Sequence, residues 1–242
     1  MISLDEKLFA ALCSGLLLVS IATAAPAQNG RRELLEKALD KKKIQGLSVS
    51  VEGGTVGLSG KVRNVFHKNE ALELALAQPD VEAVDADIEI SEAESDKKLG
   101  EEVVGQLRRY TRFTVFDDVN AYVQNGRVAL VGWVTEPFKK TELENKLHDV
   151  LGIQDFRNEI QVLPTSSSDE RLRQVLANKL YRDGSFSDFA MMPIPPVHII
   201  VERSRVILTG IVGSQLLKQK AEVIIRGTPG VLSVENRLVI GR

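Results

Sequence analysis

The chain has 242 residues, of which 43% are hydrophobic and 26% charged, and its formal net charge is −2 at pH 7. This composition is ordinary for a folded protein, and the near balance of charges gives no argument for nucleic acid as a partner. The length suits several small modules better than one large core.

The first 27 residues have the pattern of a secretory signal peptide. Residues 8–22 form an apolar run of 15 residues, too short for a comfortable membrane span, and small residues offer cleavage sites after Ala24 or Ala27. We expect residues 1–27 to be removed on export to the periplasm. An uncleaved anchor or a misplaced start codon is the alternative, because the acidic Asp5 and Glu6 offset Lys7 and weaken the positive start. Cys13, the single cysteine, lies in this run, so the mature chain should contain no disulfide.

The rest of the chain repeats one pattern three times. A predicted strand reads Val-x-Leu-x-Gly-x-Val in each copy, beginning at Val56, Val128 and Val206. A closing strand is predicted 25 residues after each of these valines, at Val81, Ile153 and Val231. Regular spacing of this kind is typical of a structural repeat.

Each copy is predicted to begin with an amphipathic helix. Ser167 and Glu170 are expected to form a capping box at the start of the third of these helices. Apolar residues recur at helical spacing in all three, at Leu34, Leu35, Ala38 and Leu39, at Leu99, Val103, Val104 and Leu107, and at Leu172, Val175, Leu176 and Leu180.

A hairpin, a second helix and a closing strand complete each copy. The hairpin turns are expected at residues 52–55, 124–127 and 202–205, and only the last contains no glycine. Helical spacing predicts the second helix, at Leu143, Leu147 and Val150 in one copy and Ala221 and Ile225 in another.

Each copy therefore reads α-β-β-α-β, which places the protein in the α+β class. Alternation along the strands predicts one buried sheet face, which two amphipathic helices can cover. We expect three tandem modules at residues 31–92, 97–163 and 168–242, each a three-stranded mixed sheet with two helices on one face.

The three copies resemble BON domains, small modules of bacterial envelope proteins. The resemblance lies in the lines ending at Val62, Val134 and Val212 and in the segment Gly230-Val231-Leu232-Ser233-Val234-Glu235-Asn236-Arg237-Leu238. The first copy departs from it, with Asp80 in place of glycine and Ala86 where the others have asparagine. The resemblance implies an exported, non-enzymatic protein that associates with phospholipid surfaces or envelope partners, similar to tandem-repeat periplasmic osmotic-stress proteins.

The sequence contains no pattern for catalysis, a metal or a cofactor. His67, His148 and His198 are far apart and form no ligand motif. Gly60, Gly132 and Gly210 are interpreted as structural glycines that allow a bend or a close helix approach. The outward positions of one strand hold Asp85, Asp87 and Glu89, for which a solvated face is the simpler account and an oxygen-rich cation site the alternative.

Charge changes steadily along the repeats. Residues 31–96 carry 9 basic and 14 acidic residues, residues 97–166 carry 10 and 10, and residues 167–242 carry 11 and 7, for nets of −5, 0 and +4. Basic groups are attracted to anionic bilayers, so the third repeat is expected to face lipid. The candidate lipid-binding residues are Arg171, Arg173, Lys179, Arg182, Phe186, Phe189, Met191 and Met192.

Two interpretations of these residues stay open. The phenylalanines and methionines of residues 184–196 can enter the membrane interface, or they can cap the core of their own module. At the level of function, the first hypothesis is a periplasmic protein that binds anionic phospholipid surfaces peripherally, in envelope integrity or osmotic stress. The second is a protein-binding scaffold or holdase-like chaperone that uses exposed apolar positions such as Trp133 on other envelope proteins.

Overall fold

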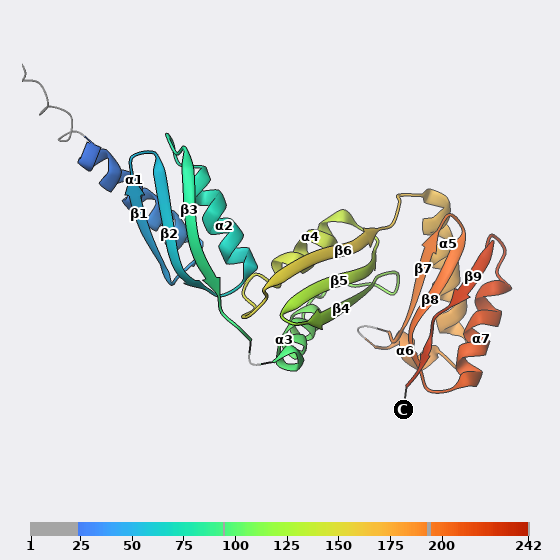
Figure 1. Cartoon of the computed structure of the whole chain (residues 1–242). Helices are drawn as coiled ribbons and strands as arrows, with labels where there is room; N and C mark the ends of the chain where they lie inside the picture. Colours follow the sequence, from blue (N-terminus) through green and yellow to red (C-terminus); the bar gives the residue numbers. More distant parts are fainter. Residues whose placement is uncertain (1–23, 94, 193–194, 242) are drawn as a thin grey trace, which may run out of the picture. The chain divides into compact units, whose positions relative to one another are not determined.

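The computed structural model describes residues 24–93, 95–192 and 195–241 (Figure 1). Two compact units are present: among the described residues, the first comprises those up to Val62 together with Phe66–Glu89, and the second comprises Arg63–Val65 and those from Ile90 onward. The first unit contains repeat 1, and the second contains repeats 2 and 3. Most of the predicted signal peptide, residues 1–23, lies outside the described residues, and residues 24–27 belong to the first helix.

The order of elements is the same in all three repeats. Repeat 1 consists of α1 (Ala24–Lys41), β1 (Leu47–Glu52), β2 (Thr55–Val62), α2 (Val65–Leu76) and β3 (Ala83–Ile90). Repeat 2 consists of α3 (Asp96–Arg108), β4 (Asp118–Gln124), β5 (Arg127–Val134), α4 (Pro137–Asn145) and β6 (Asp155–Val162). Repeat 3 consists of α5 (Ser167–Arg182), the short α6 (Ser187–Ala190), β7 (Val197–Glu202), β8 (Arg205–Val212), α7 (Gln215–Arg226), β9 (Ser233–Asn236) and β10 (Val239–Ile240).

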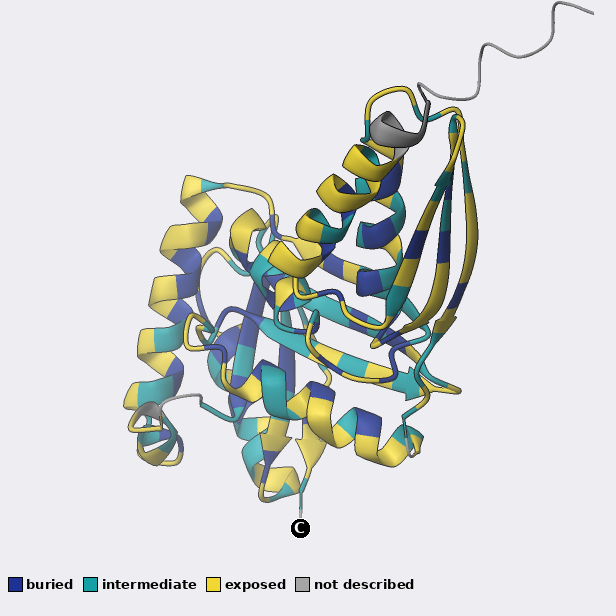
Figure 2. Ribbon diagram, turned by 90° about the vertical axis from the view of Figure 1, so that its left-hand side faces the viewer, coloured by how far each residue is buried: buried dark blue, intermediate teal, exposed yellow. Residues whose placement is uncertain are grey.

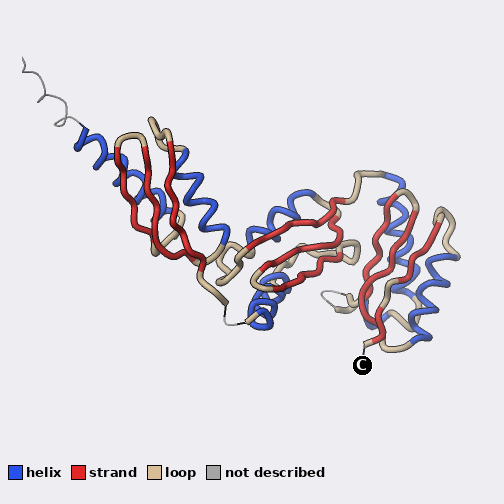
Figure 3. The backbone as a smooth tube through the Cα atoms, in the orientation of Figure 1, coloured by secondary structure: helices blue, strands red, loops and turns tan. Residues whose placement is uncertain are grey.

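The second strand of each repeat lies at the centre of its sheet. In repeat 2, β5 pairs antiparallel with β4 and parallel with β6, and in repeat 3 β8 pairs in the same way with β7 and β9. The two long helices of each repeat lie on one face of its sheet (Figure 3). The predicted α+β fold of three mixed-sheet modules is therefore confirmed.

Burial alternates along the strands as a half-covered sheet requires (Figure 2). In repeat 1, Val49 and Leu58 are buried against the helices, whereas Ser50 and Ser59 are exposed on the other face. We call this uncovered side the open face of a repeat. The core of each repeat lies between its sheet and its helices.

Several predicted boundaries were wrong by one or two residues. The closing strands begin at Ala83, Asp155 and Ser233, each two residues later than predicted. The cause is a residue with positive φ just before the predicted start, which turns the chain before it can pair: Asp80 at 58°, Gly152 at 87° and Gly230 at 93°. The helix α5 is capped by Ser166 rather than by the predicted Ser167. In repeat 2, the helix α4 ends at Asn145, before the buried Leu147 and Val150.

The glycines of the Val-x-Leu-x-Gly-x-Val lines lie against the backbone at the start of the neighbouring hairpin strand, β1, β4 or β7. Gly60, Gly132 and Gly210 have φ values of +131°, +124° and +106°. A Cβ atom on these residues would lie 2.0–2.2 Å from a backbone carbonyl oxygen, for example 2.0 Å from that of Pro196 at Gly210. The positive φ and the contact together require glycine at these positions.

Candidate membrane-binding surface and repeat junction

The helix α5 presents one apolar and one basic side. The Ser166 Oγ accepts a hydrogen bond of 3.2 Å from the backbone N–H of Asp169 and so caps the helix. Leu176 and Leu180 are fully buried in the core of repeat 3. Positions four, eight and eleven residues after Arg171 return to the same side of a helix, and that side holds Val175, Lys179 and Arg182.

We call Arg171, Lys179 and Arg182 the basic stripe. All three are exposed, and within the described part of the chain none forms an ion pair with a carboxylate. Lys179 and Arg182 lie in the last turn, where the helix dipole favours positive charge. Val175, 40% exposed, lies between them, so the stripe combines free cations with an apolar side chain.

Two of the predicted lipid-binding residues are buried instead. Arg173 donates a hydrogen bond of 2.8 Å to the carbonyl oxygen of Val201 and pairs with Glu170 at 3.1 Å. Phe186 is fully buried in the core of repeat 3, because the segment after α5 folds back onto that core. Neither side chain is available to a membrane, and both are removed from the candidate surface.

The remaining side chains of this segment divide between core and solvent. Phe189 is partly buried and packs edge-on against Phe186, with ring centroids 6.0 Å apart. Met191 is 87% exposed and Met192 45% exposed. The phenylalanines therefore cap the core of their own repeat, and the methionines stay accessible from outside.

A buried carboxylate stabilises the hairpin turn that contains no glycine. Arg203 and Ser204 at this turn have φ values of 51° and 62°, the left-handed conformation that usually needs glycine or asparagine. Their backbone N–H groups donate to the two carboxylate oxygens of Asp169, at 2.7 and 2.9 Å. Asp96 binds the corresponding turn of repeat 2 in the same way, through the N–H groups of Asn125 and Gly126.

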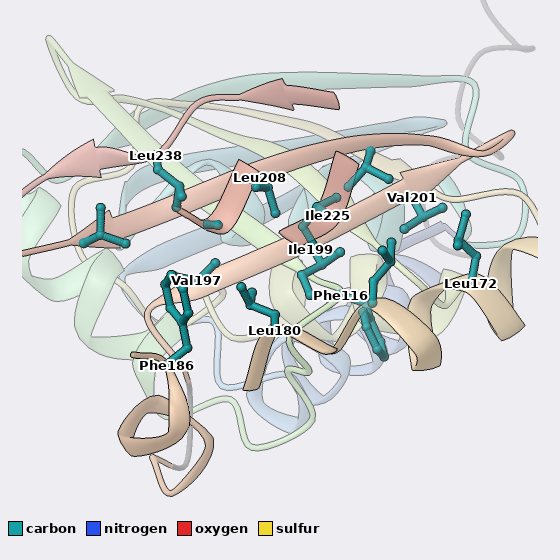
Figure 4. Close-up of a cluster of buried hydrophobic side chains, with 14 residues drawn as sticks. Phe116, Leu172, Leu180, Phe186, Val197, Ile199, Val201, Leu208, Ile225 and Leu238 are labelled. Carbon is teal, nitrogen blue, oxygen red and sulfur yellow. The ribbon is translucent and has the colours of Figure 1, made fainter. Parts of the chain in front are cut away.

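Repeats 2 and 3 are joined by a junction that the sequence did not predict. The backbone N–H of Ile199, on the edge strand β7, donates a hydrogen bond of 2.8 Å to the carbonyl oxygen of Val115. The next residue, Phe116, belongs to repeat 2 but is 8% exposed and packs in the core of repeat 3. Figure 4 shows its ring among side chains of α5 and β7 such as Leu180 and Ile199. Edge strands expose unpaired backbone groups, and this contact satisfies one of them.

The same junction covers the open face of repeat 3. Ile200 is 1% exposed and Thr209 is 7% exposed, although both face away from the helices of their own repeat. Trp133 of repeat 2 lines one cavity with Ile200, and its ring lies 5.4 Å from the guanidinium carbon of Arg237. Trp133 therefore contacts repeat 3 of its own chain.

Two titratable groups lie at this junction. Burial opposes ionisation of Asp117, but hydrogen bonds from Lys139 Nζ at 2.6 Å, from the Thr135 N–H at 2.7 Å and from Thr114 outweigh it, so the pKa of Asp117 lies below its ordinary value. Burial lowers the pKa of His198, and the nearby Asp118 and Asp117 offset part of this effect. His198 is therefore held neutral next to a charged carboxylate.

The described residues give no sign of a metal centre or of a membrane-spanning helix. Among residues 24–93, 95–192 and 195–241, no group of histidine, cysteine, aspartate or glutamate side chains could hold a metal ion. Within the same part of the chain no helix is long and apolar enough to cross a bilayer. His67 is buried in α2.

Comparison with known proteins agrees with this architecture. The BON domain family model matches residues 29–92, 95–164 and 168–242. No curated protein matches the chain. Among solved structures, the C-terminal domain of CdsD, the structural protein of the type III secretion system of Chlamydia trachomatis, is 17% identical, with a TM-score of 0.25 and coverage of 86% of this chain and 96% of that one.

The PrgH periplasmic domain is 11% identical, with a TM-score of 0.21 and coverage of 86% of this chain and 100% of that one. These similarities are low, and the family match is the finding that identifies the chain. It covers nearly all of the described residues and assigns one domain to each repeat. The chain therefore belongs to the BON domain family, a non-enzymatic family whose members are typically periplasmic or envelope-associated.

Proposed function

We propose that this protein is an exported, non-enzymatic envelope protein that binds anionic phospholipid surfaces peripherally through repeat 3. The observation that carries the proposal is the basic stripe, three exposed cations on one side of α5 with no carboxylate partner among the described residues. Phosphate groups of lipids are the anions that such a surface can meet at a membrane. Repeat 1, with a net charge of −5, would be repelled by an anionic bilayer.

The charges supply most of the expected affinity. Each basic residue near an anionic bilayer contributes about 1 kcal/mol, so the stripe contributes about 3 kcal/mol, or roughly a hundredfold in binding. Met191 and Met192 are exposed and add an apolar contribution, which salt does not screen because it involves no charge. Binding of this kind is reversible and needs no spanning helix.

Co-sedimentation with vesicles tests the proposal. Residues 28–242 are mixed with vesicles of anionic and of neutral lipids at low and at high salt. We expect binding to anionic vesicles at low salt, and we expect the variant R171E/K179E/R182E to lose it. The variant M191S/M192S should bind more weakly at every salt concentration.

A charge-matched control separates the stripe from net charge. The variant K41E/K97E/R127E changes the charge by the same amount at exposed positions of repeats 1 and 2 and should bind as the unmodified protein does. Equal loss in both triple variants would mean that only net charge matters. Unchanged binding of R171E/K179E/R182E would refute the proposal. Point substitution is preferable to deletion of repeat 3, which would expose Phe116.

A protein-binding role is the second candidate, and one observation favours it. Leu216, Val223 and Leu232 of repeat 3 are large apolar side chains that are 72%, 70% and 77% exposed. A scaffold or holdase-like chaperone would use such positions on unfolded or partner proteins. In this case, suppression of aggregation of a denatured test protein should persist at high salt and disappear in L216S/V223S/L232S.

A further inference from the structure

The open face of repeat 1 is acidic and uncovered. Its strands place the small residues Ser48, Ser50 and Ser59 on this face, and all three are exposed. The edge strand β3 adds a row of three exposed carboxylates, Asp85, Asp87 and Glu89. We call these three the acidic row. Lys61 approaches Glu89 at 3.8 Å, and the other two members form no ion pair within the described residues.

The corresponding face of repeat 3 shows that this side of the fold accepts protein. Ile200 occupies the position of Ser50 in the strand register and Thr209 that of Ser59. Both are buried, and Trp133 of repeat 2 lines one cavity with Ile200, whereas the serines of repeat 1 are exposed. The same sheet surface therefore makes a protein contact in one repeat and is free in another. In repeat 1 the absence of large apolar side chains makes a charged occupant the better match.

The chain itself carries a surface of matching charge and similar length. Asp85 and Glu89 are four residues apart on a strand, about 13 Å at roughly 3.3 Å per residue. The basic stripe runs eleven residues along α5, from Arg171 to Arg182, about 16.5 Å at 1.5 Å per residue. The charged residues of both rows are exposed. A net of −5 in repeat 1 and of +4 in repeat 3 favours the same pairing at longer range.

We propose that the protein self-associates head to tail, with the basic stripe of one copy docked on the acidic row of a second copy. The two surfaces differ, so the contact is heterologous, and repetition gives chains of copies that stay open or close into rings. Exposed ion pairs are individually weak and are screened by salt, so association should depend on protein concentration and weaken by roughly tenfold or more at high salt. The membrane and the second copy compete for the same stripe.

Sedimentation velocity of residues 28–242 over a range of concentrations tests this proposal, at about 50 mM and about 500 mM salt. The unmodified protein should form species larger than a monomer at low salt and high concentration. The variants D85K/D87K/E89K and R171E/K179E/R182E should each stay monomeric. An equimolar mixture of the two variants should associate again, because each then offers the surface that the other lacks.

The mixture is the decisive arm, since variants that had lost association through unfolding could not regain it on mixing. The control K41E/K97E/R127E should associate as the unmodified protein does. A monomer under all conditions, or a mixture of the two variants that stays monomeric, would overturn the proposal. Vesicle binding separates it from the proposed function: D85K/D87K/E89K should still bind anionic vesicles, because its basic stripe is intact. If the unmodified protein self-associates but does not bind anionic vesicles, only the membrane role is refuted.

Discussion

Phe116 couples the stability of repeats 2 and 3, and its replacement should uncouple them. The residue follows Val115 in the loop before β4, yet its ring lies in the core of repeat 3 and is 8% exposed. Removing the ring leaves a cavity between the repeats, because the β7 edge stays held by the backbone hydrogen bond from Ile199 to Val115.

The expected loss follows from the burial. Replacing a buried phenylalanine by alanine costs about 3–5 kcal/mol of unfolding free energy, and the slight exposure of Phe116 places F116A near about 3 kcal/mol. The variant F116L keeps most of the volume and should lose less than about 1.5 kcal/mol. The difference between the two variants measures the packing of the ring.

Urea unfolding monitored by tryptophan fluorescence is the appropriate assay. Trp133 is the only tryptophan in the chain, and it lies at the junction beside Arg237. F116A should lower the unfolding midpoint and also the slope of the transition, because a smaller part of the chain then unfolds together. An unchanged midpoint and slope, or equal losses in F116A and F116L, would refute the coupling through this ring.

Three further predictions concern single positions. G210A should lower the unfolding free energy by more than about 1 kcal/mol, because its Cβ would meet the Pro196 carbonyl oxygen at 2.0 Å. In the control G105A, in α3, the added Cβ meets nothing within 4 Å, so this variant should be more stable than the unmodified protein. Thermal unfolding compares the two variants. The pKa of Asp117 is lowered, so its contribution to stability is present at neutral pH and is lost as pH falls through the acidic range. The unfolding free energy of D117N, measured by urea unfolding, should be lower at pH 7 and should change less as the pH falls through that range. The pKa of His198 is lowered as well, so the folded protein loses stability as pH falls below about 6.5; in H198Q the midpoint of urea unfolding should change less between neutral and mildly acidic pH.

Local patterns predicted the repeated fold because each of them has a local cause. Alternation of apolar residues along residues 56–62 and its equivalents requires a half-buried strand, and the Asn125-Gly126 pair favours a tight hairpin turn. The 202–205 turn has no such local signature, because it contains no glycine. Its conformation depends on Asp169, which is distant in sequence and reaches the turn only after α5 packs on the sheet.

The lipid-binding candidates show the limit of composition as a guide. Arg171 and Arg173 look alike in the sequence, but a difference of two residues turns the second toward the sheet, where it binds the Val201 carbonyl oxygen. Phe186 and Met191 likewise share one apolar segment, and only Met191 stays exposed. The direction of each side chain follows from how the segment folds back on the core.

The sequence alone determined the number of repeats, their order of elements and the charge gradient, because periodicity, turn residues and formal charge are properties of short segments. Tertiary structure alone decided which basic residues form the stripe on α5, where Asp169 binds, and that Phe116 enters the core of the next repeat. These features depend on contacts between residues far apart in the chain. Side-chain direction and the burial of one repeat by another have no signature in the spacing of residues, so they appear only once the sheets and helices are packed.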